Sequence, residues 1–301
     1  MNQNEINNNR TKIKIDELFT RIDVLPPYFA LKDLEIDTKN SVFATIAKEQ
    51  SMGNEIGMIS GAEVGRHLAI LGSCSLAYLN ISNEKHYYLA YEATIKMIDK
   101  KSYSYAINNN QISTLLGTAK GEFISKKLAQ AECSILNNDG ELLYTLDVKY
   151  KVIPEAIFLR MNAKNKIKKE YYDINPYTNP LDFKNKRIED NIFKASIGSV
   201  EPNWCIGHFA EIPALPVAHL MYNITECMSQ YLRFDSLMKD INFYLNTSTI
   251  WADNLAFTGE IINFECKLLE CIEENYHFIC NAITSNNKVI GRTDSWVHVL
   301  E

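Results

Sequence analysis

The sequence of 301 residues lacks features that mark several classes of protein. It has no excess of positive charge: 37 acidic and 31 basic residues give a formal net charge of -6, so no broad basic surface for nucleic acid is expected. Its seven cysteines include no CxxC pair, which favours reduced thiols over a disulfide framework or a zinc site. We therefore expect a cytoplasmic protein that binds neither nucleic acid nor metal.

Long apolar runs are also missing. The longest uncharged stretch, residues 67–82, is shorter than the ~20 apolar residues of a membrane helix, so no membrane span is expected. Residues 1–14 are polar and rich in asparagine, without the apolar centre of a secretory signal, and are predicted to form a disordered arm. The sequence has no glycine-rich phosphate loop, nucleophile elbow or HExxH motif.

Two halves of the chain resemble each other. Residues 131–153 and 278–300 each contain two strand-like runs around a polar turn, and an offset of 147 places Gly140 on Asn287. Residues 59–79 and 212–232 are apolar at spacings of three, four and seven, which predicts one long helix in each half. This pattern indicates an internal duplication.

Strand-like runs follow each predicted helix, which favours an antiparallel sheet in each half. Residues 161–187 are rich in lysine and asparagine, contain two prolines, and form the natural linker. We therefore predict four segments. They are a disordered arm (1–14), an N-terminal unit (15–160), a linker (161–187) and a C-terminal unit (188–301).

The segment IGHFAEIPALPVAHLM, residues 206–221, resembles the signature of the hotdog-fold hydroxyacyl thioester dehydratases. In that pattern a His-Phe pair precedes a proline-bearing loop and the start of the central helix. The residues at matching positions are His208, Phe209, Pro213, Pro216 and Val217. The resemblance implies an α+β double hotdog, in which each half is an antiparallel sheet wrapped around a long central helix. It also implies an active site between the two units.

The resemblance implies that His208 removes the C2 proton of a 3-hydroxyacyl thioester, while a helix carboxylate of the other unit protonates the departing hydroxyl. The family's carboxylate position is occupied by Tyr222 in the second half, whereas the first helix carries Glu63, Arg66 and His67. We therefore predict one composite site. Its catalytic residues are His208, Glu63 and His67, and its substrate-binding residues are Arg66, Gly61, Val217 and Phe209.

Glu63 also has a structural interpretation. Ser60 and Glu63 form a capping-box pattern, with Ser60 as the helix N-cap. The repeat alignment places Ala69, not Glu63, at the family's carboxylate position, a displacement of roughly 9 Å along a helix. His67 fits a buried structural histidine as well as a catalytic one.

Three functions remain open. The first is a 3-hydroxyacyl dehydratase acting on acyl carrier protein (ACP) or CoA thioesters in fatty acid or polyketide-type biosynthesis. The second is a hotdog thioesterase in which Glu63 activates water or attacks the thioester. The third is a non-catalytic acyl-carrier binding or partner subunit. In each case the substrate brings its own phosphopantetheine and no other cofactor is expected. A homodimer or an assembly with other biosynthetic enzymes is compatible with all three.

Overall fold

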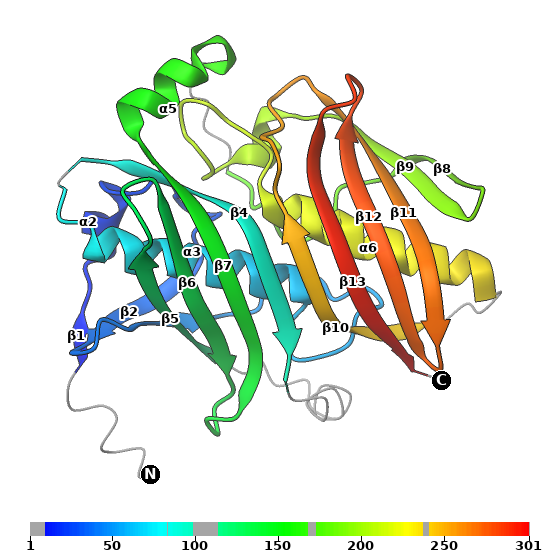
Figure 1. The fold of residues 1–301 in the computed structure, drawn as a ribbon, viewed down its shortest axis with the longest axis horizontal. Helices are drawn as coiled ribbons and strands as arrows, with labels where there is room; N and C mark the ends of the chain where they lie inside the picture. Colours follow the sequence, from blue (N-terminus) through cyan, green and yellow to red (C-terminus); the bar gives the residue numbers. More distant parts are fainter. Residues whose placement is uncertain (1–9, 83, 99–113, 168–172, 237–240, 301) are drawn as a thin grey trace.

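The computed structural model describes residues 10–82, 84–98, 114–167, 173–236 and 241–300. Strands dominate this part of the chain, and they form one antiparallel sheet of 13 strands (Figure 1). The first-half strands are β1 (Arg10–Lys12), β2 (Leu31–Asp37), β3 (Val42–Ile46), β4 (His86–Met97), β5 (Leu115–Phe123), β6 (Leu128–Leu136) and β7 (Leu142–Pro154). The second-half strands are β8 (Lys184–Glu189), β9 (Ile192–Ser199), β10 (Asn242–Trp251), β11 (Ile261–Ile272), β12 (Asn275–Thr284) and β13 (Val289–Leu300).

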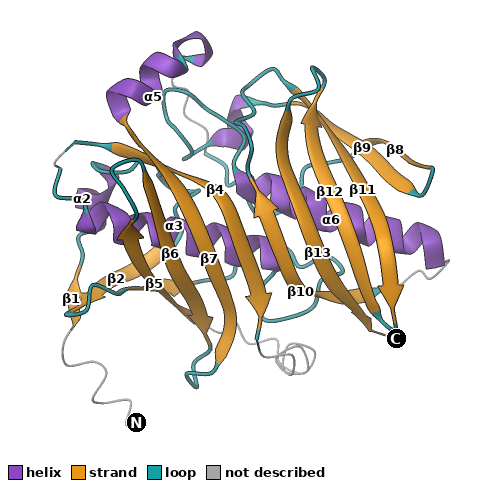
Figure 2. Cartoon of the chain, in the orientation of Figure 1, coloured by secondary structure: helices purple, strands orange, loops and turns teal. Residues whose placement is uncertain are grey.

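Two of the described helices are long, and both pack on one face of the curved sheet (Figure 2). The helices are α2 (Ile15–Phe19), α3 (Gly61–Leu79), α5 (Glu155–Met161) and α6 (Val217–Ser236), with short 3-10 turns η2 (Ala163–Asn165) and η3 (Pro202–Cys205). Helix α3 packs against strands β3 to β7, whereas α6 packs against β9, β11 and β12. None of the described helices is long and apolar enough to cross a membrane.

The predicted α+β double hotdog, with each half an antiparallel sheet wrapped around its own long central helix, is wrong. Strands of both halves belong to one sheet, because β4 pairs with β10 from Lys96↔Thr247 to Glu92↔Trp251. An unpaired strand edge leaves N–H and C=O groups without partners, and this pairing satisfies them across the two halves. Periodicity within a strand does not encode which strand lies beside it.

The strand order supports the predicted duplication. It runs β3-β5-β6-β7-β4 in the first half and continues in mirrored order, β10-β13-β12-β11-β9, in the second. The hairpin turns that the alignment matched both contain a left-handed residue, Gly140 at φ 80° and Asn287 at φ 61°.

The division of the chain into an arm, two units and a linker stays a prediction. Of the predicted disordered arm, residues 1–9 lie outside the described residues and Arg10–Lys12 form β1; linker residues 168–172 are also outside them.

Helix α3 begins where the capping pattern predicts. The Ser60 hydroxyl accepts a hydrogen bond from the Glu63 amide at 3.2 Å, which satisfies one of the free donors of the first turn. Helix α6 begins at Val217, five residues later than the matched apolar segment, directly after Pro216. Proline is poorly tolerated in a helix interior, which explains the later start.

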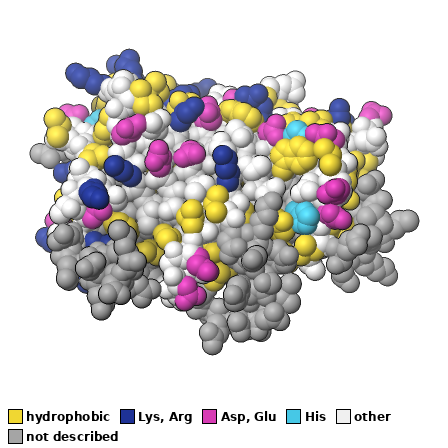
Figure 3. All heavy atoms as spheres, turned by 60° about the horizontal axis from the view of Figure 1, so that its bottom comes forward, with side chains coloured by type: hydrophobic (Ala, Val, Ile, Leu, Met, Phe, Trp, Pro, Cys, Tyr) yellow, Lys and Arg dark blue, Asp and Glu magenta, His cyan; other side chains and the backbone are white. Residues whose placement is uncertain are grey.

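Charged side chains of both signs are interspersed on the molecular face shown in Figure 3. Several charged groups of the described residues are paired, including Lys149 with Glu92 at 2.7 Å and Arg292 with Asp253 at 2.9 Å. Because the signs alternate, this face offers no extended patch of one charge to a partner.

Two glycines of α3 predict opposite effects of one substitution. In Gly72→Ala the new methyl group would lie 2.4 Å from the Tyr150 hydroxyl, so we expect the free energy of unfolding to fall by about 1–3 kcal/mol. In Gly65→Ala the methyl group meets no atom within 4 Å. Replacing a glycine in the helix interior should raise the free energy of unfolding by up to ~1 kcal/mol. Urea denaturation measures both, and equal effects at the two positions would contradict this packing.

Candidate functional site

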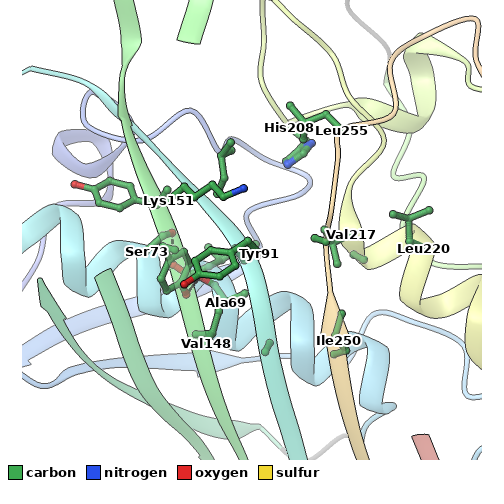
Figure 4. A pocket seen from close by; sticks show the side chains of 18 of the residues that line it. Ala69, Ser73, Tyr91, Val148, Lys151, His208, Val217, Leu220, Ile250 and Leu255 are labelled. Atoms are coloured by element: carbon green, nitrogen blue, oxygen red, sulfur yellow. Dashed lines mark hydrogen bonds between the residues drawn. The ribbon is translucent and has the colours of Figure 1, made fainter. Parts of the chain in front are cut away.

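A cavity of about 320 Å³ lies where the two halves meet, between α3, β4 and β7 of the first half and β10 and the start of α6 of the second (Figure 4). Its walls are mainly apolar, with side chains such as Ala69, Val148 and Ile250. A smaller set of polar groups, including His208 and Lys151, also faces it. A concave apolar site with few polar groups is typical of small-molecule binding.

The imidazole of His208 is the central polar group of this cavity. His208 as a residue is 8% exposed, and its Nδ1 lies 2.8 Å from the carbonyl oxygen of Ala214. A carbonyl oxygen only accepts hydrogen bonds, so Nδ1 carries the proton and Nε2 presents its lone pair. Among the described residues Nε2 has no hydrogen-bond partner. The ring therefore offers a neutral base to whatever occupies the cavity.

Burial lowers the pKa of His208 from 6.5 to about 4, because the charged imidazolium loses solvation inside the protein. Two contacts oppose this shift by favouring the charged form, the hydrogen bond to Ala214 and the negative charge of Asp23. The ring is also held between aromatic neighbours, with Phe209 stacked at 3.8 Å and Tyr28 edge-on at 5.0 Å between centroids. The histidine is thus uncharged at neutral pH and fixed in orientation.

Sequence reasoning missed Asp23, which anchors the loop that carries His208. Its Oδ2 accepts hydrogen bonds from the Ala210 amide at 3.0 Å and the Tyr87 hydroxyl at 2.9 Å. Its Oδ1 pairs with Lys85 at 2.8 Å, so the carboxylate, 5% exposed, is compensated. No local pattern around Asp23 reveals this role, because Ala210 lies 187 positions further along the chain.

The backbone of the loop explains why glycine precedes the histidine. Gly207 adopts φ 80°, and a Cβ atom there would lie 2.2 Å from the carbonyl oxygen of Leu25. Leu25 in turn donates its amide to Gly207, and Val24 forms an isolated β-bridge with His208. Only glycine fits both the left-handed conformation and the close backbone approach.

Arg66 lines the cavity, but its guanidinium is already engaged. Its Nε donates to the Tyr28 carbonyl at 3.0 Å, one terminal nitrogen to Glu49 at 3.0 Å, and the other to the Pro27 carbonyl at 2.5 Å. It also lies 4.7 Å above the centre of the Tyr177 ring. Arg66 thereby supports Tyr28, the neighbour of His208. The substrate contact predicted for Arg66 stays a prediction.

Glu63 and His67 lie close to Arg66 in α3 but outside the cavity wall. Both are fully buried and pair with each other at 3.3 Å, and neither lines the cavity. The Glu63 Oε1 atom accepts the Glu49 and Gln50 amides, whereas Oε2 and the His67 Nδ1 atom have no partner among the described residues. The structure does not bring these two residues to the cavity surface beside His208, and their catalytic roles stay predictions.

The three remaining predicted residues differ in position. Phe209 and Val217 line the cavity together with His208, Val217 as the first residue of α6. Gly61 begins α3, and its amide donates to the buried Glu55 carboxyl group at 2.7 Å. Burial raises the pKa of Glu55 to about 7. The backbone amides of Gly61 and Val217, two of the predicted substrate-binding residues, therefore differ, because that of Val217 lacks a hydrogen-bond acceptor among the described residues.

Several polar groups reach the cavity from the sheet. Lys151 of β7 extends its side chain into it, toward the side on which His208 lies, and its ammonium group lies 5.5 Å from the Tyr91 ring centre (Figure 4). Glu92 and Asp253 also line the cavity, but each carboxylate is paired with a basic side chain. In the described part of the chain no group of three His, Cys, Asp or Glu side chains could hold a metal ion.

No protein-family model and no curated protein sequence matches this chain. Solved structures do match it in fold. The 12:0-ACP thioesterase from Umbellularia californica gives a TM-score of 0.56 at 9% identity, over 87% of this chain and 95% of that one. The tesB protein of Mycobacterium avium subs paratuberculosis also gives 0.56 at 9% identity, over 92% and 100%. A protein with a hotdog fold from Alicyclobacillus acidocaldarius gives 0.51 at 10% identity, over 89% and 96%.

At such low identities these matches concern the fold alone. The predicted resemblance to hotdog-fold proteins is confirmed at that level, although the strands are not divided into two separate sheets.

The lowered pKa of His208 predicts a pH-dependent stability. Between pH 6.5 and about 4 the unfolded chain binds a proton at this histidine that the folded chain does not, so stability falls as the pH falls through this range. The loss due to His208 amounts to about 3 kcal/mol at 1.36 kcal/mol per pH unit. Urea denaturation between pH 4 and 8 should therefore show that the free energy of unfolding falls less steeply with decreasing pH in His208→Gln than in the wild type. Parallel curves for the two proteins would refute the lowered pKa.

Proposed function

We propose that the protein hydrolyses acyl thioesters carried on the pantetheine arm of CoA or of an acyl carrier protein. The observation that carries this proposal is the neutral imidazole of His208, whose unpartnered Nε2 belongs to a largely apolar cavity. The fold shared with the structure described as a 12:0-ACP thioesterase supports it. An apolar cavity suits an acyl chain, and an uncharged base beside it suits the activation of water.

The reaction follows from the position of the base. Nε2 of His208 accepts a proton from a water molecule, and the water oxygen forms a bond to the thioester carbonyl carbon. The C–S bond then breaks, and the imidazolium returns the proton to the departing sulfur. Asp23 and the Ala214 carbonyl, which favour the charged ring, stabilise the imidazolium while it carries that proton.

The start of α6 supplies positive partial charge for the oxygen of the attacked carbonyl. The amide of Val217 belongs to the first turn of this helix, whose N-terminus is electropositive. The Ala218 amide in the same turn is already hydrogen-bonded to the Tyr28 hydroxyl. An unpaired amide at such a position stabilises the negative oxygen that develops on the attacked carbonyl.

A dehydratase is the second candidate, favoured by one observation. Three of the five residues that match the dehydratase signature, His208, Phe209 and Val217, line the same cavity, whereas the two matching prolines do not. The same base could remove a C2 proton from a 3-hydroxyacyl thioester. Elimination also needs an acid for the departing hydroxyl, and Glu63, the residue predicted for that role, does not line the cavity. Hydrolysis needs no second side chain.

Removing the base should abolish most of the activity. With decanoyl-pantetheine and 3-hydroxydecanoyl-pantetheine, mass spectrometry follows thiol release and loss of water separately. We expect thiol release by the wild type and a decrease of about 10²–10⁴-fold in His208→Gln. His277→Gln is the matched control, because His277 pairs with Asp294 and does not line the cavity. Water loss without thiol release would favour the dehydratase. The absence of both products would overturn both candidate functions.

The pH profile of hydrolysis provides an independent check. The free base must be neutral, so kcat/KM should be constant from neutral pH down to about pH 5 and should fall tenfold per unit below about 4, the folded-state pKa of His208. Stopped assays on decanoyl-pantetheine measure this profile. A fall centred near 6.5, the ordinary pKa of histidine, would show that another histidine or an unburied His208 controls the rate.

A further inference from the structure

Helix α3 presents a row of small residues to the cavity. Gly65, Ala69 and Ser73 line it at positions i, i+4 and i+8, which share one face of a helix. At a rise of 1.5 Å per residue the row is roughly 12 Å long. Larger side chains at these positions would occupy the space that the cavity now provides.

The polar atoms of this row are satisfied within the protein. The Ser73 hydroxyl donates to the carbonyl of Ile70 at 2.7 Å, and the Tyr150 hydroxyl donates to the carbonyl of Ala69 at 2.8 Å. Val148 and Ile250 line the cavity from strands β7 and β10 (Figure 4). The row therefore offers a ligand an apolar wall with no free hydrogen-bonding group.

Gly65 keeps part of this space open. A Cβ atom at this position would meet no atom within 4 Å, in contrast to Gly72, where it would lie 2.4 Å from Tyr150. Packing therefore explains the glycine at position 72 but not the one at position 65. A glycine in a helix interior is unfavourable compared with alanine. At position 65 the missing side chain leaves part of the cavity unfilled.

His208 is an independent sign of a ligand at one end of the row. Its side chain is more than nine-tenths buried, and its Nε2 atom has no protein partner among the described residues. Arg66, next to Gly65, lies 5.5 Å from the Tyr28 ring, which packs 5.0 Å from the His208 ring. The Gly65 end of the row is therefore the end associated with the base, and Ser73 marks the far end.

We propose that this row binds a linear saturated acyl chain of about ten carbons, with its thioester at His208 and its methyl end at Ser73. The proposal rests on the function proposed above and specifies its substrate. The length follows from the row of roughly 12 Å. An extended alkyl chain advances roughly 1.25 Å per carbon, so a row of this length accommodates about ten carbons.

Binding of pantetheine thioethers tests the proposal without catalysis, because a thioether cannot be hydrolysed. Isothermal titration calorimetry with the hexyl, decyl and hexadecyl thioethers should show affinity rising about fourfold per methylene up to decyl. The hexadecyl compound should bind more weakly than the decyl one, since its chain exceeds the cavity. Equal affinity for all three would overturn the proposal.

A larger side chain at the far end should shorten the preferred chain. In Ser73→Leu we expect at least a tenfold loss of affinity for the decyl thioether and no change for the hexyl one. Tyr78→Leu is the matched control on the same helix, because Tyr78 is 46% exposed and does not line the cavity. Ala69→Leu is the second variant and should act in the same direction, which keeps the test decisive if Ser73→Leu does not fold.

The two proposals fail in different ways. Hydrolysis of decanoyl-pantetheine with a length preference that neither Ser73→Leu nor Ala69→Leu alters would overturn the acyl-chain site and leave the hydrolase standing. The expected binding pattern without hydrolysis would support the acyl-chain site and overturn the hydrolase.

Discussion

One hydrogen bond, from Nδ1 of His208 to the carbonyl of Ala214, determines what the cavity can do. It places the ring proton on the side away from the free nitrogen and leaves Nε2 as a base. The bond depends on the loop around it, which Asp23 holds through the Ala210 amide and to which Gly207 allows a close backbone approach. The chemistry therefore rests on an arrangement that spans distant parts of the chain.

The second constraint is the pairing of β4 with β10, which joins the two halves in one sheet. Because of this pairing, α3, β4 and β7 of the first half face β10, the start of α6 and His208 of the second half across one cavity. Arg66 supports the same junction by donating hydrogen bonds to the carbonyls of Pro27 and Tyr28, and the Tyr28 ring packs against the His208 ring. Neither half contains the complete cavity wall.

Local patterns in the sequence were sufficient to predict several secondary-structure elements and some of the residues that line the cavity. Ser60 predicted the start of α3, and the aligned turns at Gly140 and Asn287 share their left-handed conformation. The segment with His208 and Phe209 predicted residues that do line the cavity. In each case the signal lies within a few neighbouring residues, where spacing and backbone preference act directly.

Contacts between distant segments could not be predicted in the same way. Asp23 has no motif around it, and its contact with the loop at Ala210 arises only after the halves have packed. The division into two sheets was wrong because periodicity reports which face of a strand is buried, not which strand is its neighbour. The catalytic role of Glu63, which the family resemblance implied, stays a prediction, and no local pattern indicated that its Oε1 accepts the backbone amides of Glu49 and Gln50.

The proposed chemistry requires a neutral His208, with its proton on Nδ1 and its Nε2 open to the cavity. Long-range proton–nitrogen NMR of the protein with nitrogen-15-labelled histidine measures this directly, with His208→Gln identifying the signals. We expect a protonated Nδ1 and an unprotonated Nε2 at neutral pH, unchanged on acidification to about pH 5. A charged imidazolium or the tautomer with the proton on Nε2 at neutral pH would contradict it.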